Sequence, residues 1–295
     1  MHKNEAKINI DIVKDLVYLQ FPKWKKETIK EITYSGTDNI VYKLGKDKCI
    51  RLPRTQQGEN QIKKEQKWLP KLGPNLPLNT PELIDIGKPD NKYPYVWSIY
   101  NWIEGVEAYD NKPINLNDTA KLLANFINSL HKISAKFAPK AKRGLPLISQ
   151  NDAVQQAILD LKSLYDPKAI AALWKDCLQA PEWHKPGVWL HGDLLPSNLI
   201  IKEGKLHGII DFGLFGKGDP ACDLIPAWCL FDAGARKTFK NHLDIDEDTW
   251  TRGRGWALSI ALIIIPYYTQ TNPKLVSIAK NMIDQILEEW KCPGN

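Results

Sequence analysis

The chain has 295 residues, of which 43% are hydrophobic and 25% charged, so it can build one large domain or two modest ones. Five cysteines without a C-x-x-C pair argue against a disulfide framework and a structural zinc site. The most apolar run, residues 256–268, is too short to span a bilayer, so we predict a buried helix there and no membrane partner. The N-terminus has no apolar signal segment, which favours a cytoplasmic protein.

The net charge of +6 lies in the N-terminal third of the chain. Residues 1–102 hold 18 basic and 12 acidic residues, and the remaining 22 basic and 22 acidic residues cancel. A basic nucleic-acid-binding module is one interpretation. Because the lysines of residues 23–30 are mixed with acids and not set among stacking aromatic rings, we favour a solvated surface beside a phosphate-binding cleft and expect no nucleic-acid partner.

The N-terminal third is predicted to begin with a helix over residues 8–21, where apolar residues recur at helical spacing. Two alternating strands follow over residues 28–34 and 40–44, separated by a turn of small polar residues that includes Ser35, Gly36 and Thr37. Such a turn could fold its backbone N–H groups over phosphates, and a plain hairpin turn would look the same.

The next predicted strand, residues 48–52, places a cation on one face of the sheet. Alternation puts Ile50 and Leu52 on one side and Cys49 and Arg51 on the other. A nucleotide cleft requires a small residue that leaves room for adenine and a cation that binds the phosphates, which Cys49 and Arg51 would supply. The alternative is that Arg51 forms a surface ion pair on an edge strand. The further elements predicted here are a helix, a proline-rich connection and two strands, over residues 59–72, 74–81, 82–87 and 95–102.

The rest of the chain is predicted to be mainly helical. Asn117 or Asp118 would cap a helix that ends near residue 134 and carries a structural histidine, His131. Two helices, a short strand and a helical C-terminal region are predicted for residues 152–164, 167–178, 188–190 and 223 onward. The acidic run at residues 244–248 could cap helices or face a cationic substrate.

The most informative stretch lies between the predicted strand at residues 188–190 and the helical region that begins at residue 223. His191, Asp193 and Asn198 form an H-x-D-x-x-x-x-N pattern, and Asp211 opens a D-F-G after a hairpin predicted to turn at residues 203–204. Folding the chain about that turn brings Asn198 and Asp211 to the same end of the hairpin. A carboxylate and an amide oxygen suit Mg²⁺, whose coordination substrate phosphates complete. Asp193 would then accept a proton from an attacking hydroxyl.

The combination H-G-D-x-x-x-x-N followed by I-D-F-G resembles the aminoglycoside phosphotransferase family, the antibiotic-kinase branch of the kinase-like fold. Gly192 stands where protein kinases have arginine, which argues against a protein kinase. The resemblance covers essentially the whole chain. It implies an α+β, bilobal, protein-kinase-like fold, with an antiparallel-sheet N-lobe over residues 1–102 and a mainly helical C-lobe over residues 103–295, in a monomer or weak dimer.

The same resemblance implies transfer of the γ-phosphoryl group of ATP or GTP to a hydroxyl of a small molecule, with Mg²⁺ as cofactor. Asp193 would be the catalytic base, and Asn198 and Asp211 would hold the metal. Arg51, where the family usually has lysine, would hold the phosphates and pair with Glu65, or with Glu59 as the fallback.

Other residues receive supporting roles from the resemblance. Residues 98–100, with Ser98 and Tyr100, would contact adenine as the hinge, and Ile200 and Ile210 would form an apolar floor under the purine. His191, Asp219 and Asp223 would brace the catalytic loop, although Asp219 can equally be a plain helix cap.

The resemblance leaves the acceptor open. An aminoglycoside or related antibiotic is the first interpretation, and a metabolic alcohol of the homoserine, choline or thioribose kind is the second. The balanced charge of residues 103–295 weakens the case for a polycationic acceptor. A nucleotide-binding pseudokinase is a further alternative, against which the complete set of Asp193, Asn198 and Asp211 argues.

Overall fold

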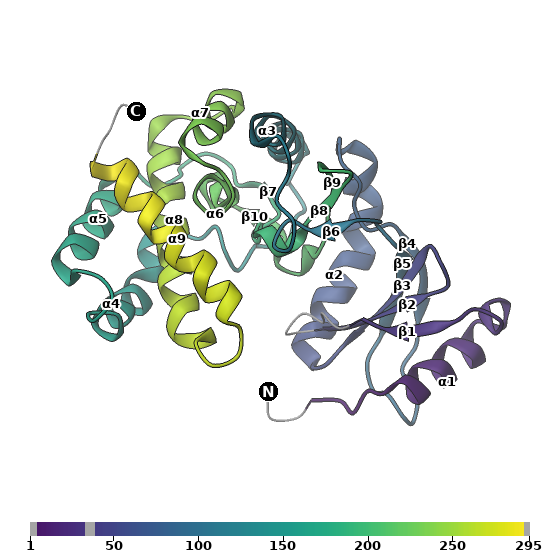
Figure 1. Ribbon diagram of the computed structural model, residues 1–295. Coiled ribbons are helices and arrows are strands. Elements are labelled where there is room, and N and C mark those ends of the chain that lie inside the picture. Colours follow the sequence, from purple (N-terminus) through teal and green to yellow (C-terminus); the bar gives the residue numbers. More distant parts are fainter. Residues whose placement is uncertain (1–4, 33–38, 292–295) are drawn as a thin grey trace. The chain divides into compact units, whose positions relative to one another are not determined.

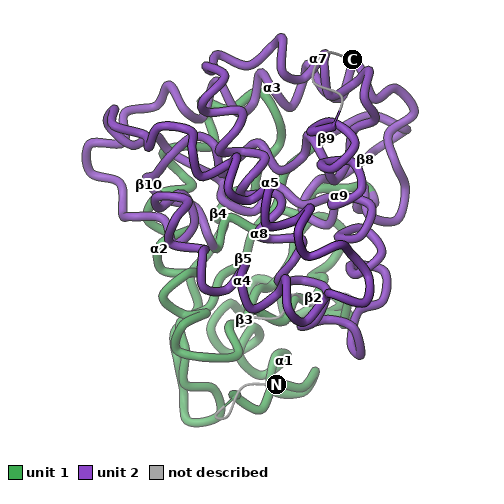
Figure 2. The backbone as a smooth tube through the Cα atoms, turned by 90° about the vertical axis from the view of Figure 1, so that its left-hand side faces the viewer, with its two compact units in different colours: residues 1–105, 208–213 green, residues 106–207, 214–295 purple. Residues whose placement is uncertain are grey.

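The computed structural model describes residues 5–32 and 39–291, and its backbone divides into two compact units (Figures 1 and 2). Unit 1 comprises residues 1–105 and 208–213, and unit 2 comprises residues 106–207 and 214–295. The boundary predicted between residues 102 and 103 assigned residues 208–213 to the C-lobe, whereas these residues belong to unit 1. The antiparallel sheet and the helix-rich remainder confirm the predicted α+β fold class.

Unit 1 is built on a five-stranded antiparallel sheet with the order β1-β2-β3-β5-β4. Its strands are β1 Ile29–Glu31, β2 Asn39–Leu44, β3 Lys48–Pro53, β4 Leu83–Gly87 and β5 Trp97–Asn101. The helices of this unit are α1 Ile10–Gln20 and α2 Gln56–Leu72, each followed by a short 3-10 turn, at Pro22–Trp24 and Gly73–Asn75 respectively. Strand β1 covers only part of the predicted residues 28–34, and residues 33–38 lie outside the described part.

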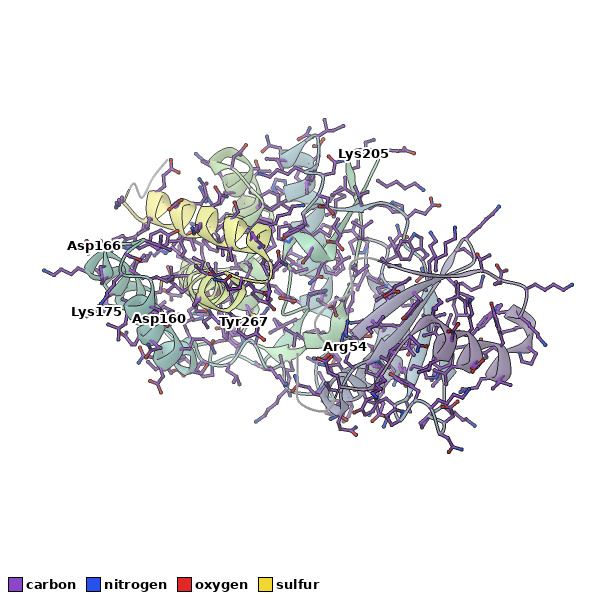
Figure 3. All side chains as sticks on the ribbon, turned by 60° about the horizontal axis from the view of Figure 1, so that its bottom comes forward. Arg54, Asp160, Asp166, Lys175, Lys205 and Tyr267 are labelled. Carbon is purple, nitrogen blue, oxygen red and sulfur yellow. The ribbon has the colours of Figure 1, made fainter. Side chains whose placement is uncertain are left out.

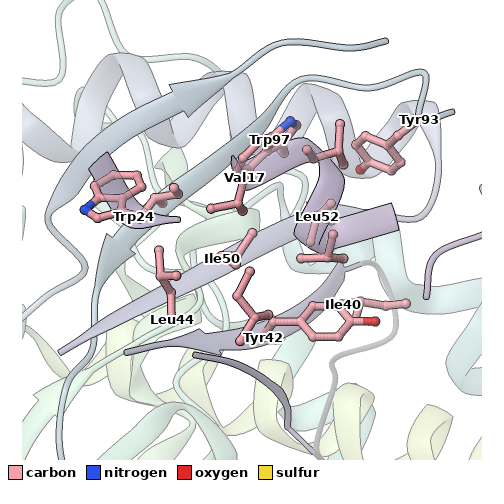
Figure 4. Packing of buried hydrophobic residues seen from close by; sticks show 13 residues of the cluster. Val17, Trp24, Ile40, Tyr42, Leu44, Ile50, Leu52, Tyr93 and Trp97 are labelled. Atoms are coloured by element: carbon pink, nitrogen blue, oxygen red, sulfur yellow. The ribbon is translucent and has the colours of Figure 1, made fainter. Parts of the chain in front are cut away.

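The hydrophobic core of unit 1 lies between α1 and the sheet (Figure 4). Val17 of α1 belongs to the same cluster of buried side chains as Ile50 and Leu52 of β3 and Trp97 of β5. Because side chains alternate along a strand, this packing directs Arg51 to the opposite face, where α2 lies against β3. The predicted facing of β3 is therefore confirmed.

Unit 2 is mainly helical. Its helices are α3 Leu116–Lys132, α4 Asn151–Asp160, α5 Pro167–Gln179, α6 Pro226–Cys229, α7 Ala233–His242, α8 Glu247–Tyr268 and α9 Pro273–Lys291. The 3-10 turns are η3 Leu147–Gln150, η4 Pro196–Asn198, η5 Phe212–Leu214, which begins in unit 1, and η6 Pro220–Leu224. The short strands are β6 Val106–Glu107, β7 Val188–Leu190, β8 Leu199–Lys202, β9 Lys205–Ile209 (which ends in unit 1) and β10 Gly216–Gly218.

Helix boundaries in unit 2 correct two details of the prediction. Helix α3 is capped by Asn115, whose side chain accepts from the backbone N–H of Asp118 at 3.0 Å, so the predicted caps Asn117 and Asp118 are wrong. Helix α4 ends at Asp160 rather than residue 164, and Asp166 stands just before α5 (Figure 3). The Asp166 side chain caps α5 by accepting from the N–H of Lys168 at 3.0 Å. No helix in the described part of the chain is long and apolar enough to cross a membrane.

Candidate active site

The catalytic-loop sequence of residues 191–198 lies in unit 2 and follows directly from β7. Gly192 has φ +79°, a left-handed conformation that side chains with a Cβ rarely adopt. A Cβ at this position would also lie 3.1 Å from the carbonyl oxygen of Leu214. The glycine of the H-G-D motif is therefore required by the backbone path of the loop, which explains why an arginine does not stand there.

Asp223 braces the backbone of this loop, as predicted. Its fully buried carboxylate accepts from the backbone N–H of His191 at 2.9 Å and from that of Gly192 at 2.8 Å. His131 of α3 lies 3.3 Å from the same carboxylate through Nε2, which confirms it as a structural histidine. A carboxylate with donors on both oxygens fixes the loop where the strand ends.

His191 also lies inside the loop rather than on its surface. Its side chain is fully buried, and Nδ1 accepts from the backbone N–H of Asp193 at 3.2 Å. This geometry agrees with the bracing role predicted for His191 and leaves Asp193 as the carboxylate of the loop that is partly exposed to solvent.

The Asp193 carboxylate is held from two sides within unit 2. Asn198 Nδ2 donates to the Asp193 carbonyl at 2.8 Å and lies 3.3 Å from Oδ2. Arg143 Nη1 pairs with Oδ1 of Asp193 and donates to the carbonyl of Gly192 at 3.1 Å. Burial by itself would lower the pKa of Arg143, and the adjacent Asp193 carboxylate outweighs it and raises that pKa. Sequence reasoning missed Arg143, which stands 50 residues before Asp193 and belongs to no motif.

Asp219 takes the capping role that the sequence left open. Its carboxylate accepts from the N–H of Ala221 at 3.0 Å at the start of η6. It also forms a buried ion pair with Arg252 Nε at 2.7 Å. These contacts tie η6 to α8, and the bracing role of Asp219 at the catalytic loop stays a prediction.

Unit 1 contains a network of one cation and two carboxylates, in which Arg51 and Glu65 are buried and Asp211 is partly exposed. Arg51 Nη1 lies 2.8 and 2.9 Å from the two carboxylate oxygens of Glu65, and Nη2 lies 2.5 Å from Oδ1 of Asp211. Burial alone would lower the pKa of Arg51, but the carboxylates of Glu65 and Asp211 outweigh burial and raise it, so the guanidinium stays charged. The predicted pairing of Arg51 with Glu65 is present, and Glu59 instead bonds the N–H of Val96 at 2.9 Å.

Asp211 adopts an unusual backbone conformation for a residue other than glycine, with φ +61°. Its Oδ1 also accepts from the N–H of Gly213 at 3.3 Å, a local bond that favours this conformation for aspartate. Such a conformation costs on the order of 1 kcal/mol and is typical of functional positions.

Ser98 and Tyr100, the predicted adenine contacts, lie in the interior strand β5, and their contact with adenine stays a prediction. Strand β5 lies between β3 and β4, so its backbone groups belong to the sheet on both sides. Both side chains are buried: Ser98 Oγ accepts from Gln66 at 2.9 Å, and the Tyr100 hydroxyl donates to Glu65 at 3.2 Å. Tyr100 thus supports the Arg51–Glu65 pair, and Ser98 bonds a neighbouring residue of α2.

The remaining predicted nucleotide contacts are placed as follows. Ile200 is a buried residue of β8 in unit 2, and Ile210 is a partly exposed residue of unit 1. Their role under the purine stays a prediction. Ser35, Gly36 and Thr37 lie outside the described residues.

The predicted metal ligands have the right donor chemistry for Mg²⁺. The amide nitrogen of Asn198 is engaged by Asp193, so the amide oxygen is the atom with which it could bind a cation. Both named hydrogen bonds of Asp211 use Oδ1. Within residues 5–32 and 39–291, no group of three or more His, Cys, Asp or Glu side chains could hold a metal. A site with one carboxylate, one amide and substrate phosphates is the kind that Mg²⁺ uses.

Comparison with known proteins identifies the family of the chain. Residues 28–256 match the model of the phosphotransferase enzyme family. An aminoglycoside 3'-phosphotransferase of Salmonella typhimurium is 30% identical over 42% of this chain and 47% of its own length. One from Escherichia coli is 28% identical over 58% of this chain and 64% of its own length, so these matches span about half to two thirds of the relatives.

Solved structures show the same fold. The GDP complex of wild-type aminoglycoside 2'-phosphotransferase-IIIa superposes with a TM-score of 0.75 at 18% identity, over 96% of this chain and all of that one. The macrolide 2'-phosphotransferase MphH from Brachybacterium faecium has a TM-score of 0.61 at 17% identity, over 92% and 98%. Together with the matched residues 28–256, which cover well over half of the sequence, these similarities place the chain in the phosphotransferase enzyme family.

Proposed function

We propose that the protein is a small-molecule kinase that transfers the γ-phosphoryl group of ATP or GTP to a hydroxyl of its acceptor. The observation that carries the proposal is the Asp193 carboxylate, held by Asn198 and Arg143 in a loop that Asp223 braces through two backbone bonds. Family membership and the buried Arg51–Glu65 pair support it. A carboxylate immobilised in this way can receive a proton from a hydroxyl that it has oriented.

In the proposed reaction, Asp193 accepts the proton of the acceptor hydroxyl as that oxygen forms a bond to the γ-phosphorus. The bond between the γ-phosphorus and the bridging oxygen of the nucleotide breaks, and ADP or GDP leaves with the electron pair. Asp193 then releases the proton to solvent. The chain contributes orientation and charge more than base strength, because phosphoryl transfer depends mainly on positioning and electrostatic stabilisation.

Arg51 is proposed to bind the phosphates of the nucleotide while Glu65 fixes the direction of its guanidinium. Because a guanidinium has five N–H donors in a planar fork, Arg51 can keep Glu65 on Nη1 and Asp211 on Nη2 and still offer a remaining N–H to a phosphate. We assign Asn198 and Asp211 as ligands of Mg²⁺ because they flank the β8–β9 hairpin and have oxygen donors. When bound, Mg²⁺ would neutralise charge on the phosphates.

An aminoglycoside or a related antibiotic is the acceptor we propose. The support is that the similar curated proteins are named aminoglycoside 3'-phosphotransferases and that structures with the same fold include aminoglycoside and macrolide phosphotransferases. The alternative is a metabolic alcohol, which the balanced charge of residues 103–295 favours over a polycation. A pseudokinase that binds nucleotide without transfer is the non-catalytic alternative.

The test is release of ADP and GDP by the purified protein with Mg²⁺, measured across aminoglycosides, macrolides and small metabolic alcohols. We expect one acceptor class to stimulate release, and Asp193→Asn and added chelator to abolish the stimulation. Nucleotide binding without stimulation by any acceptor would favour the pseudokinase. Equal stimulated release by wild type and Asp193→Asn would refute Asp193 as the base.

A further inference from the structure

Arg143 contacts the catalytic loop but lies outside it in the sequence. It stands in the segment between α3 and η3, and its guanidinium pairs with Oδ1 of Asp193 and donates to the Gly192 carbonyl at 3.1 Å. Its side chain is 29% exposed and that of Asp193 21% exposed, so the pair is mostly removed from solvent.

The segment that carries Arg143 is fixed to β10, the strand that pairs with β7, from which the catalytic loop continues. The N–H of Ala141 donates to the carbonyl of Lys217 at 3.0 Å, and the N–H of Lys217 donates to that of Pro139 at 2.7 Å. The N–H of Asp219 donates to the carbonyl of Gly144 at 2.8 Å. Residues 139–144 therefore run as an extra edge along β10, which itself pairs with β7.

Gly144 shows how closely this segment approaches the loop. It has φ +83°, and a Cβ there would lie 2.3 Å from the side chain of Leu190, the last residue of β7. The residue after Arg143 is thus packed directly against the residue before His191. The backbone of unit 2 therefore brings Arg143 close to the catalytic loop, where its guanidinium contacts Asp193.

We propose that Arg143 is a positioning residue that fixes the orientation of the Asp193 carboxylate for phosphoryl transfer. Arg143 holds one oxygen of that carboxylate and the Asn198 amide lies by the other, so the carboxylate plane is defined from both sides. The bond from Arg143 to the Gly192 carbonyl also fixes the peptide that precedes Asp193. This inference rests on the proposed function, in which Asp193 orients the acceptor hydroxyl.

A purely stabilising ion pair does not account for the arrangement equally well. Removing two charges from water costs about as much as their attraction returns, so a mostly buried pair is weak evidence for a role in stability. Phosphoryl transfer depends more on the positions of the reacting groups than on the strength of the base. The role that remains for the Arg143–Asp193 pair is to orient the Asp193 carboxylate.

The test compares steady-state kinetics of Arg143→Ala, Arg143→Lys and Lys142→Ala with wild type, using the acceptor found in the panel. Arg143→Ala is expected to lower kcat about 100-fold, while the acceptor KM and the nucleotide Kd stay within about threefold. Arg143→Lys should recover part of kcat, since an ammonium can reach the same oxygens. Lys142→Ala removes the neighbouring exposed charge and should behave as wild type.

Chemical rescue separates positioning from a folding defect. Added guanidinium is expected to raise kcat of Arg143→Ala, and urea, which has a similar shape and no charge, is not. Arg143→Ala with wild-type kcat, or with equal responses to guanidinium and urea, would overturn the proposal. Thermal melting identifies a variant that fails to fold, in which case Arg143→Lys and Arg143→Gln carry the comparison. A wild-type protein as slow as Asp193→Asn would instead contradict the proposed function itself.

Discussion

The guanidinium of Arg51 in β3 lies 2.5 Å from the carboxylate of Asp211, a residue 160 positions later in the sequence. The same guanidinium holds Glu65 of α2 through its other terminal nitrogen. One cation therefore joins a strand, a helix and the D-F-G sequence within unit 1. An arginine can span both carboxylates at once, which a single ammonium on a flexible stem does less well.

Replacement of Arg51 by alanine should strongly destabilise the protein, because the buried Glu65 carboxylate would lose its cationic partner and keep only the Tyr100 hydroxyl. Removing one member of a buried pair typically costs about 3–5 kcal/mol in the free energy of unfolding. Arg51→Lys should cost less, since the ammonium can still reach Glu65. Urea unfolding measures both, with Lys23→Ala, which breaks an exposed pair with Asp85, as the control. Arg51→Ala as stable as this control would contradict the assignment.

Replacement of Asp223 should affect both stability and turnover. Asp223→Ala leaves the backbone N–H groups of His191 and Gly192 buried without an acceptor, at a cost of about 1–3 kcal/mol for each. Asp223→Asn keeps one carbonyl oxygen and should lie between alanine and wild type. Urea unfolding and kcat are the measurements, and an unchanged kcat in a folded Asp223→Ala would argue that the loop needs no brace.

Gly192→Ala tests the backbone conformation of the catalytic loop. A left-handed conformation costs a residue with a Cβ about 1–2 kcal/mol, and the new methyl group would crowd the Leu214 carbonyl. We expect lower stability in urea and slower phosphoryl transfer. The matched control is Gly234→Ala in helix α7, where the Cβ has room, its nearest neighbour lying 3.6 Å away, and alanine should stabilise. If both variants were equally stable, the strain argument would fail.

Glu107 in β6 should make the stability of the protein depend on pH. Burial and the neighbouring Asp110 raise the pKa of its carboxyl from 4.5 to about 7, against the opposing charge of Lys274. The folded state therefore binds the proton more tightly than the unfolded state, and this contribution is present below pH 4.5 and lost as pH rises through 7. Because the group is partly exposed, solvent screening limits the effect to about 1 kcal/mol.

The variant Glu107→Gln checks this sign. The glutamine side chain cannot ionise, so the variant does not lose this contribution as wild type does. The free energy of unfolding of the variant minus that of wild type should therefore rise between pH 4.5 and pH values above 7. Denaturant unfolding across that range provides the measurement. A difference between variant and wild type that stays constant with pH would show that Glu107 titrates normally.

Local patterns in the sequence predicted much of the fold and part of the site. The alternation in β3 gave the facing of Arg51, and the turn at residues 203–204 gave the hairpin, because both depend on neighbours in the chain. The bracing contacts of Asp223 followed from a family motif. Two other features could not be predicted from local patterns in the sequence. Whether β5 is an edge or an interior strand depends on strand order, and Arg143 reaches Asp193 only through the pairing of residues 139–144 with β10.

The central claim is that Asp193 directs transfer of a γ-phosphoryl group to an acceptor hydroxyl. The most direct measurement is a single-turnover reaction of wild type and Asp193→Asn with nucleotide, Mg²⁺ and acceptor, followed by mass spectrometry of the acceptor, with nucleotide binding measured in parallel. The account predicts a phosphorylated acceptor from wild type and a rate lower by about 10²–10⁴ in Asp193→Asn, with nucleotide binding preserved. Phosphorylated acceptor formed at the same rate by both proteins would contradict it.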